Sequence, residues 1–123
     1  MSRRPAAHLR HGSAAEAAAA AHLRNAGLAL KHRNFSCRHG EIDLIMEHRG
    51  ELVFVEVRYR QDNAYGGAVE SIDQSKRRRL RRTADFYLQQ HPEQGHRGCR
   101  FDIVAVSGPA AAGRCDWIVN AFW

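Results

Sequence analysis

Two acidic residues and one arginine stand out because their spacing suits phosphate chemistry. Asp43 is followed, after twelve residues, by Glu56, Val57 and Arg58. Hard divalent cations such as Mg²⁺ take oxygen ligands and commonly bind one or two carboxylates together with phosphate oxygens and water. Such an ion can polarise a phosphodiester, and a neighbouring cation can stabilise the charge that develops. The pattern therefore predicts a metal site at Asp43 and Glu56, with Arg58 beside it.

Two neighbouring strands must position these carboxylates. Residues 41–47 and 52–60 alternate apolar and polar side chains with the period of two that is typical of strands. A hairpin closed by residues 48–51 would place Asp43 directly opposite Glu56. Facing residues hold their Cβ atoms about 5 Å apart, and like charges there repel unless a positive group separates them. The hairpin therefore favours a cation between the two carboxylates.

The same alternation predicts which side chains share a face of the sheet. One face is expected to carry Ile42, Leu44 and Met46. Asp43 then shares the other face with Ile45 and Phe54, and charges beside buried apolar side chains need a partner or a metal. The alternative is a solvated face on which Asp43 and Glu56 each pair with an arginine, because exposed ion pairs are common. Both interpretations remain open.

Helical patterns precede and follow the hairpin. Ser13 and Glu16 have the spacing of a capping box before an alanine-rich stretch that ends at residues 25–27. Ser71 and Gln74 repeat that spacing before a longer basic helix, which ends where a His-Pro pair follows. Glu16 can therefore complete the metal site from the first helix or serve only as a capping residue.

Strands are further predicted over residues 28–35, 101–106 and 117–119, so the expected fold class is α/β. A chain of 123 residues fits one compact domain. Residues 1–12 lack apolar periodicity and are expected to form a flexible basic arm, which leaves 13–123 as the single domain.

The charge balance points to a polyanionic partner. Nineteen Lys and Arg residues against thirteen Asp and Glu residues give a net charge of +6, with a pI near 9.9. Such an excess favours nucleic acid, although a merely soluble basic surface is the alternative. The basic residues expected to contact phosphates are Arg60, Lys76, Arg77, Arg78 and Arg81. For those on the helix, the alternative is a solvated helix face.

Cysteine usage and hydropathy indicate the compartment. Cys37, Cys99 and Cys115 are odd in number and form no CxxC pair, so we expect reduced thiols. The N-terminal alanine run imitates a signal peptide, but Glu16 and Arg24 interrupt it. No apolar run approaches the ~20 residues that cross a bilayer. We therefore expect a cytoplasmic protein without a membrane partner.

Several blocks together resemble one bacterial family. The blocks are residues 40–45, 54–60 and 100–102, Lys76, and the ending 120–122. Over about residues 12–123 the chain resembles the YraN-type family, which is related to the PD-(D/E)xK nucleases and to archaeal Holliday-junction resolvases. A combination of blocks is far more specific than a lone D…ExK motif.

The resemblance implies a restriction-endonuclease-like, three-layer fold with a mixed sheet flanked by helices, and Mg²⁺ or Mn²⁺ as cofactor. Glu16 would match the glutamate of the first helix in the resolvase pattern. Asp43 and Glu56 would match the metal ligands, joined by the Val57 carbonyl. Arg58 stands where the family pattern has a lysine, and a guanidinium stays protonated and cannot act as a base. Because such resolvases are dimers, the resemblance also implies a homodimer.

The leading hypothesis is a nucleic-acid-binding, metal-dependent endonuclease that hydrolyses DNA phosphodiester bonds, with a preference for branched or junction DNA. Asp43, Glu56, Glu16 and Arg58 would form its catalytic site. The alternative is a non-catalytic nucleic-acid-binding module that keeps the nuclease fold. A protein-interaction scaffold is a third class, but it leaves the facing carboxylates unexplained.

Overall fold

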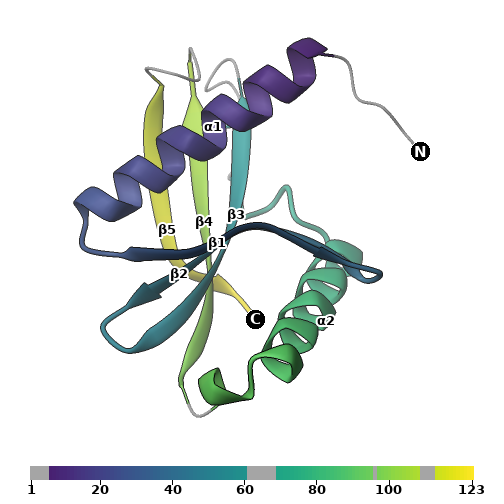
Figure 1. The fold of residues 1–123 in the computed structure, drawn as a ribbon. Helices are drawn as coiled ribbons and strands as arrows, with labels where there is room; N and C mark the ends of the chain where they lie inside the picture. Colours follow the sequence, from purple (N-terminus) through teal and green to yellow (C-terminus); the bar gives the residue numbers. More distant parts are fainter. Residues whose placement is uncertain (1–5, 61–68, 96, 109–112) are drawn as a thin grey trace.

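A five-stranded sheet with one helix on each face is the framework of the molecule (Figure 1). The computed structural model describes residues 6–60, 69–95, 97–108 and 113–123. The elements in chain order are α1 (Ala6–Asn25), β1 (Ala29–Cys37), β2 (Gly40–His48), β3 (Glu51–Arg60), α2 (Gln74–Gln90), the short 3-10 helix η1 (Pro92–Gln94), β4 (Cys99–Ser107) and β5 (Arg114–Phe122).

The sheet is mixed and its strands follow chain order, β1-β2-β3-β4-β5. Neighbouring strands are antiparallel except β3 and β4, which are parallel. Parallel neighbours need a crossover, and α2 lies in the connection between them. The predicted α/β class is therefore confirmed, and the arrangement is consistent with a restriction-endonuclease-like fold.

Each face of the sheet carries its own apolar cluster. The α1 cluster joins helix residues such as Ala19 and Leu23 to Leu44, Met46, Val53 and Val55 of the hairpin. The α2 cluster joins Leu80, Ala84 and Tyr87 to Ile45, Leu52, Phe54 and Phe101. Because both faces of β2 and β3 are buried, these strands are apolar on both sides, and a charged side chain in them must find a partner.

The hairpin register is as predicted from Leu44 to His48, whereas the predicted pair of Asp43 with Glu56 lies beyond the end of the paired ladder. Leu44 pairs with Val55, and Ile45 pairs with Phe54. The turn between the strands has positive φ angles at both central residues, 52° at Arg49 and 85° at Gly50. Positive φ at both positions defines the two-residue turn whose twist matches antiparallel strands.

The face assignment of Ile42 is wrong. Ile42 packs in the α2 cluster, whereas Leu44 packs in the α1 cluster. The paired ladder between β2 and β3 ends at Leu44, and Asp43 uses its side chain to accept a hydrogen bond from the Val57 N–H. On the β1 side, Asn34 has a φ of 53°. The alternation therefore changes phase at Asp43.

Both capping-box predictions are also wrong. Helix α1 begins at Ala6, so Ser13 lies within it. The residues before Ser13 are mostly good helix formers and follow a proline, which is favoured at a helix start. Helix α2 is capped by Asp73, whose carboxylate accepts a hydrogen bond from the Lys76 N–H at 2.8 Å. The division into a basic arm and one domain stays a prediction, and residues 1–5 lie outside the described residues.

All three cysteines and both α-helices lie in the described part of the chain. Cys37, Cys99 and Cys115 are free thiols. Burial raises the pKa of the Cys99 and Cys115 thiols. Within the described ranges, neither helix is long and apolar enough to cross a membrane.

Candidate metal centre

Asp43 and Glu56 meet where the pairing of β2 with β3 ends. The Val57 N–H donates to Oδ2 of Asp43 at 2.8 Å, and the carboxyl of Glu56 lies close enough to act on the charge of Asp43. The Glu56 side chain is only 5% exposed. Burial and the charge of Glu56 raise the pKa of Asp43 to about 8, against the opposing effect of the Val57 N–H. Without a metal, the Asp43 carboxyl therefore keeps its proton at neutral pH.

Two cations contact the same oxygen of Glu56. Nζ of Lys76, from the first turn of α2, lies 2.8 Å from Oε2, and Nη1 of Arg58 lies 3.5 Å from it. Ser71 fixes the Arg58 guanidinium, because Nε donates to the hydroxyl at 3.1 Å and Nη2 donates to the backbone carbonyl at 3.0 Å. The carboxylate pair is thus flanked by one tethered guanidinium and one ammonium.

Glu16 approaches the pair from α1. Its negative charge contributes to the raised pKa of Asp43. Oε1 of Glu16 also forms an ion pair with Nη2 of Arg33 on β1, at 3.8 Å. Because Glu16 lies inside a helix that begins at Ala6, its interpretation as a capping residue is wrong. Glu16 on α1 therefore acts electrostatically on the pair of strand carboxylates, while its own ion pair is with Arg33.

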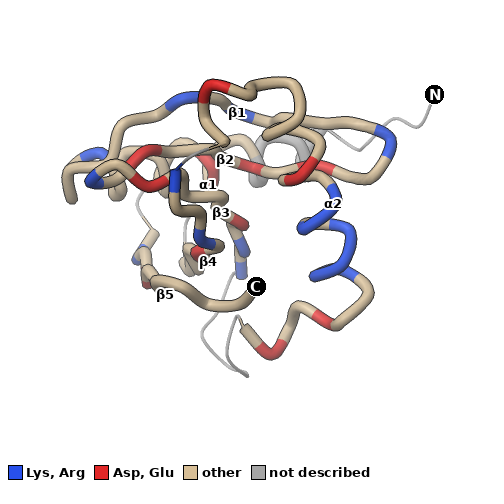
Figure 2. The backbone as a smooth tube through the Cα atoms, turned by 90° about the horizontal axis from the view of Figure 1, so that it is seen from below, with Lys and Arg blue, Asp and Glu red and all other residues tan. Residues whose placement is uncertain are grey.

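The predicted phosphate-contacting residues divide into two groups. Figure 2 shows Lys and Arg positions following one another along α2. Lys76 belongs to the carboxylate site, and the exposed side chains of Arg60 and Arg78 lie at the end of β3 and on α2.

Arg77 and Arg81 instead bind the protein's own backbone. Nε of Arg77 donates to the carbonyl of Ile72 at 3.0 Å, and its guanidinium lies 5.4 Å from the centroid of the Phe122 ring. Nη1 of Arg81 donates to the carbonyl of Trp123 at 2.7 Å. These two side chains attach α2 to the preceding loop and to the C-terminal segment.

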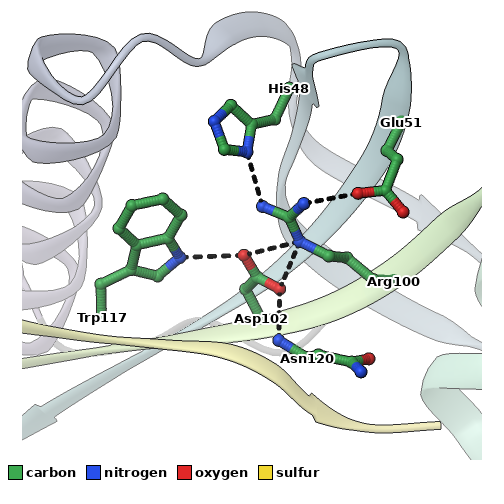
Figure 3. A network of polar contacts seen from close by, with 6 residues as sticks. All are labelled: His48, Glu51, Arg100, Asp102, Trp117 and Asn120. Carbon is green, nitrogen blue, oxygen red and sulfur yellow. Dashed lines mark hydrogen bonds and ion pairs between the residues drawn. The ribbon is translucent and has the colours of Figure 1, made fainter.

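Figure 3 shows a second polar network, which is centred on Arg100 and Asp102. Asp102 on β4 is fully buried and accepts hydrogen bonds from Nε of Arg100 at 3.0 Å, from the Trp117 indole at 2.9 Å and from the Asn120 N–H at 2.9 Å. Arg100 also pairs with Glu51 at 2.7 Å. Because its oxygens are taken up by donors, Asp102 cross-links β4 and β5 and is unsuited to binding a metal.

The sequence did not predict the contacts of this network. Arg100 and Asp102 are two residues apart on a strand, so they share a face, and that spacing was the available signal. Their partners come from the ends of β2 and β3 and from β5, which no local pattern connects to β4.

The donor atoms at Asp43 and Glu56 fit a hard cation that retains water. Within the described residues, no group of three or more His, Cys, Asp and Glu side chains is arranged to hold a metal. Two carboxylates must therefore be supplemented by water, backbone or ligand oxygens, which is the usual situation for Mg²⁺. An extended strand directs the N–H and the C=O of one residue to the same side. The Val57 carbonyl therefore lies on the side of Asp43.

The fold and this locus define an α/β protein with an acidic pair, of which the buried member, Glu56, contacts two cations. The sequence model of the uncharacterised protein family UPF0102 matches residues 15–106, a range that includes Glu16, Asp43, Glu56, Arg58 and Lys76. The chain belongs to this family, which confirms the YraN-type resemblance seen in the sequence blocks.

Relatives of similar length accompany the family match. A UPF0102 protein of Stutzerimonas stutzeri is 49% identical over 111 residues, which cover 90% of this chain and 92% of the relative. A UPF0102 protein of Pseudomonas aeruginosa is 50% identical over 113 residues, which cover 90% of each chain. One from Alcanivorax borkumensis is 48% identical over 113 residues, which cover 91% of this chain and 90% of the relative.

Proposed function

We propose that this protein is a metal-dependent endonuclease that hydrolyses phosphodiester bonds in DNA, with a preference for branched or junction structures. The proposal rests mainly on one observation, the meeting of Asp43 and Glu56 beside the Val57 N–H, Arg58 and Lys76. Burial and the charge of Glu56 also raise the pKa of Asp43 to about 8. A divalent ion between the carboxylates would remove that repulsion and displace the proton.

The cofactor proposed is Mg²⁺ or Mn²⁺, held by Asp43, Glu56 and the Val57 carbonyl oxygen. When bound, the ion would polarise the phosphodiester and lower the pKa of the attacking water. The chain's own residues orient the reactants around it. Glu16 adds negative charge on the α1 side of the locus, where it can accept a hydrogen bond from the attacking water.

Arg58 has the role of a fixed positive charge. Its guanidinium cannot serve as a base at any working pH. Two hydrogen bonds to Ser71 hold it in place beside Glu56, so it needs no reorganisation to stabilise charge on the phosphate as the bond breaks. Lys76 contacts the same phosphate, and the exposed Arg60 and Arg78 contact neighbouring ones.

A non-catalytic nucleic-acid-binding module is the second candidate. It is favoured by the arginine at position 58 and by the two cations that already neutralise Glu56. In that case the basic residues would bind phosphates while the carboxylate pair serves only to position Arg58 and Lys76.

We also propose, from the family resemblance, that the protein acts in the cytoplasm and that it is a homodimer. Light scattering can test the dimer.

The decisive experiment compares labelled single-stranded, duplex and four-way-junction DNA with Mg²⁺ or Mn²⁺. Wild type is tested beside Asp43→Asn and Glu56→Gln, which keep the side-chain shape and remove the charge. Asp116→Asn is the matched control, because Asp116 is an exposed residue of β5 that pairs with Arg114. The nuclease proposal is supported if wild type and the control cleave DNA and the two site variants do not.

Other results separate the remaining candidates. Salt-sensitive binding without cleavage by any form supports the binding module, because phosphate contacts release counterions and therefore weaken as salt rises. Neither binding nor cleavage contradicts both nucleic-acid proposals and favours a protein-interaction scaffold.

A further inference from the structure

Lys76 contacts one of the two carboxylate oxygens through which Glu56 could bind a metal. Nζ of Lys76 lies 2.8 Å from Oε2 of Glu56, within a site where that carboxylate is only 5% exposed. Arg58 approaches the same oxygen at 3.5 Å. Only the Glu56 carboxylate is nearly buried, but an ammonium and a divalent ion on one of its oxygens still repel each other. Each cation therefore weakens the binding of the other to Glu56.

Lys76 is the cation that is able to move. The Arg58 guanidinium is anchored by Ser71 through two hydrogen bonds. The backbone of Lys76 is fixed by the Asp73 cap, but its ammonium sits on a flexible four-carbon stem and the side chain is 33% exposed. A small rotation of that stem carries the charge from Glu56 towards solvent, where a phosphate would lie.

The residue type agrees with a movable charge. The chain has nineteen Lys and Arg residues, and only two of them are lysines, Lys31 and Lys76. An arginine at the position of Lys76 would form a planar, forked pair that holds its carboxylate in one geometry. A lysine forms a single-point contact that exchanges partners readily.

We propose that Lys76 is an exchangeable counter-ion that couples metal binding to phosphate binding. The inference rests on the proposed metal site at Asp43 and Glu56. In the unliganded protein the ammonium neutralises Glu56 and competes with a divalent ion. A phosphodiester anion gives the ammonium another partner, which frees Oε2 for the metal. Metal and phosphate thereby increase each other's affinity by the same factor. Lys76 is thus a positioning residue that favours metal binding when substrate is present.

The test is a Mn²⁺ titration, followed by the paramagnetic resonance signal of the free ion, with and without dimethyl phosphate. Wild type is expected to bind Mn²⁺ about tenfold more tightly when dimethyl phosphate is present. Lys76→Gln is expected to bind Mn²⁺ about tenfold more tightly than wild type without phosphate, and to lose the phosphate effect. Lys76→Arg keeps the positive charge beside Glu56 and should keep the weak binding of the unliganded protein.

Lys31→Gln is the matched control, because it removes the other lysine and its exposed ion pair with Glu47 at 3.2 Å. Its titrations should match wild type. If Lys76→Gln binds Mn²⁺ with wild-type affinity while Glu56→Gln abolishes binding, the exchange is refuted and the metal site stands. If Glu56→Gln changes nothing, the metal site fails and the exchange fails with it. Circular dichroism of each variant checks the fold.

Discussion

The proton on Asp43 should make the metal-free protein less stable as pH rises. Its pKa increases from an ordinary value of 3.8 to about 8 in the folded chain, first because of burial and next because of Glu56. Between those values the native state binds a proton that the unfolded state has released. The free energy of unfolding therefore falls by about 1.4 kcal/mol for each pH unit. Over the whole window the loss is roughly 6 kcal/mol.

The substitution that tests this is Asp43→Asn. The side-chain carbonyl of asparagine can still accept the hydrogen bond from the Val57 N–H, but it cannot ionise. The variant should match wild type near pH 4, where Asp43 is protonated in the native state, and should exceed it by several kcal/mol above pH 8. Urea unfolding in the presence of a chelator, repeated across the pH range, measures both curves.

Asp116→Asn controls for the loss of one negative charge. Asp116 is exposed and pairs with Arg114 on the same strand, so its variant should follow the wild-type curve closely. Parallel curves for wild type and Asp43→Asn between pH 5 and pH 8 would show that Asp43 is ionised in the native state, and the reasoning would be refuted.

Further predictions concern metal, the buried network and the hairpin turn. Mn²⁺ should raise the stability of wild type by about 2.7 kcal/mol at one hundred times its Kd, measured as a shift in Tm, and Glu56→Gln should abolish that shift. Asp102→Asn should cost about 3 kcal/mol by urea unfolding, because it removes the buried charge that pairs with Arg100; a loss below 1 kcal/mol would contradict the cross-link. Gly50→Ala should cost about 1 kcal/mol at a φ of 85°, and an unchanged urea midpoint would contradict the turn assignment.

The hairpin and its register could be predicted because local physics determines them. Alternation in residues 41–47 and 52–60 and the Arg49-Gly50 turn allow one pairing in which apolar side chains meet. The same reasoning could not find the phase change at Asp43, because that change depends on a hydrogen bond from Val57 on the other strand. When a side chain takes the place of a backbone group in the pairing of two strands, the alternation of apolar and polar residues in the sequence does not reveal it.

The cation next to Glu56 shows a second limit of the sequence. The spacing of Glu56 and Arg58 predicts a neighbouring guanidinium, and the structure confirms that contact at 3.5 Å. The closer contact comes from Lys76, which lies on a helix that packs against the sheet by tertiary interactions alone. The run of basic residues in α2 predicted a charged helix face. Which of these basic side chains points towards the sheet depends on how Leu80 and Tyr87 pack, and the sequence alone does not determine that packing.

Anomalous diffraction from crystals soaked with Mn²⁺ and dimethyl phosphate would locate the proposed metal site directly. We expect one strong anomalous peak beside the carboxylates of Asp43 and Glu56, with the Lys76 ammonium withdrawn from Glu56. Crystals that show no ion near either carboxylate, while the ammonium still lies on Glu56, would contradict the proposed metal site.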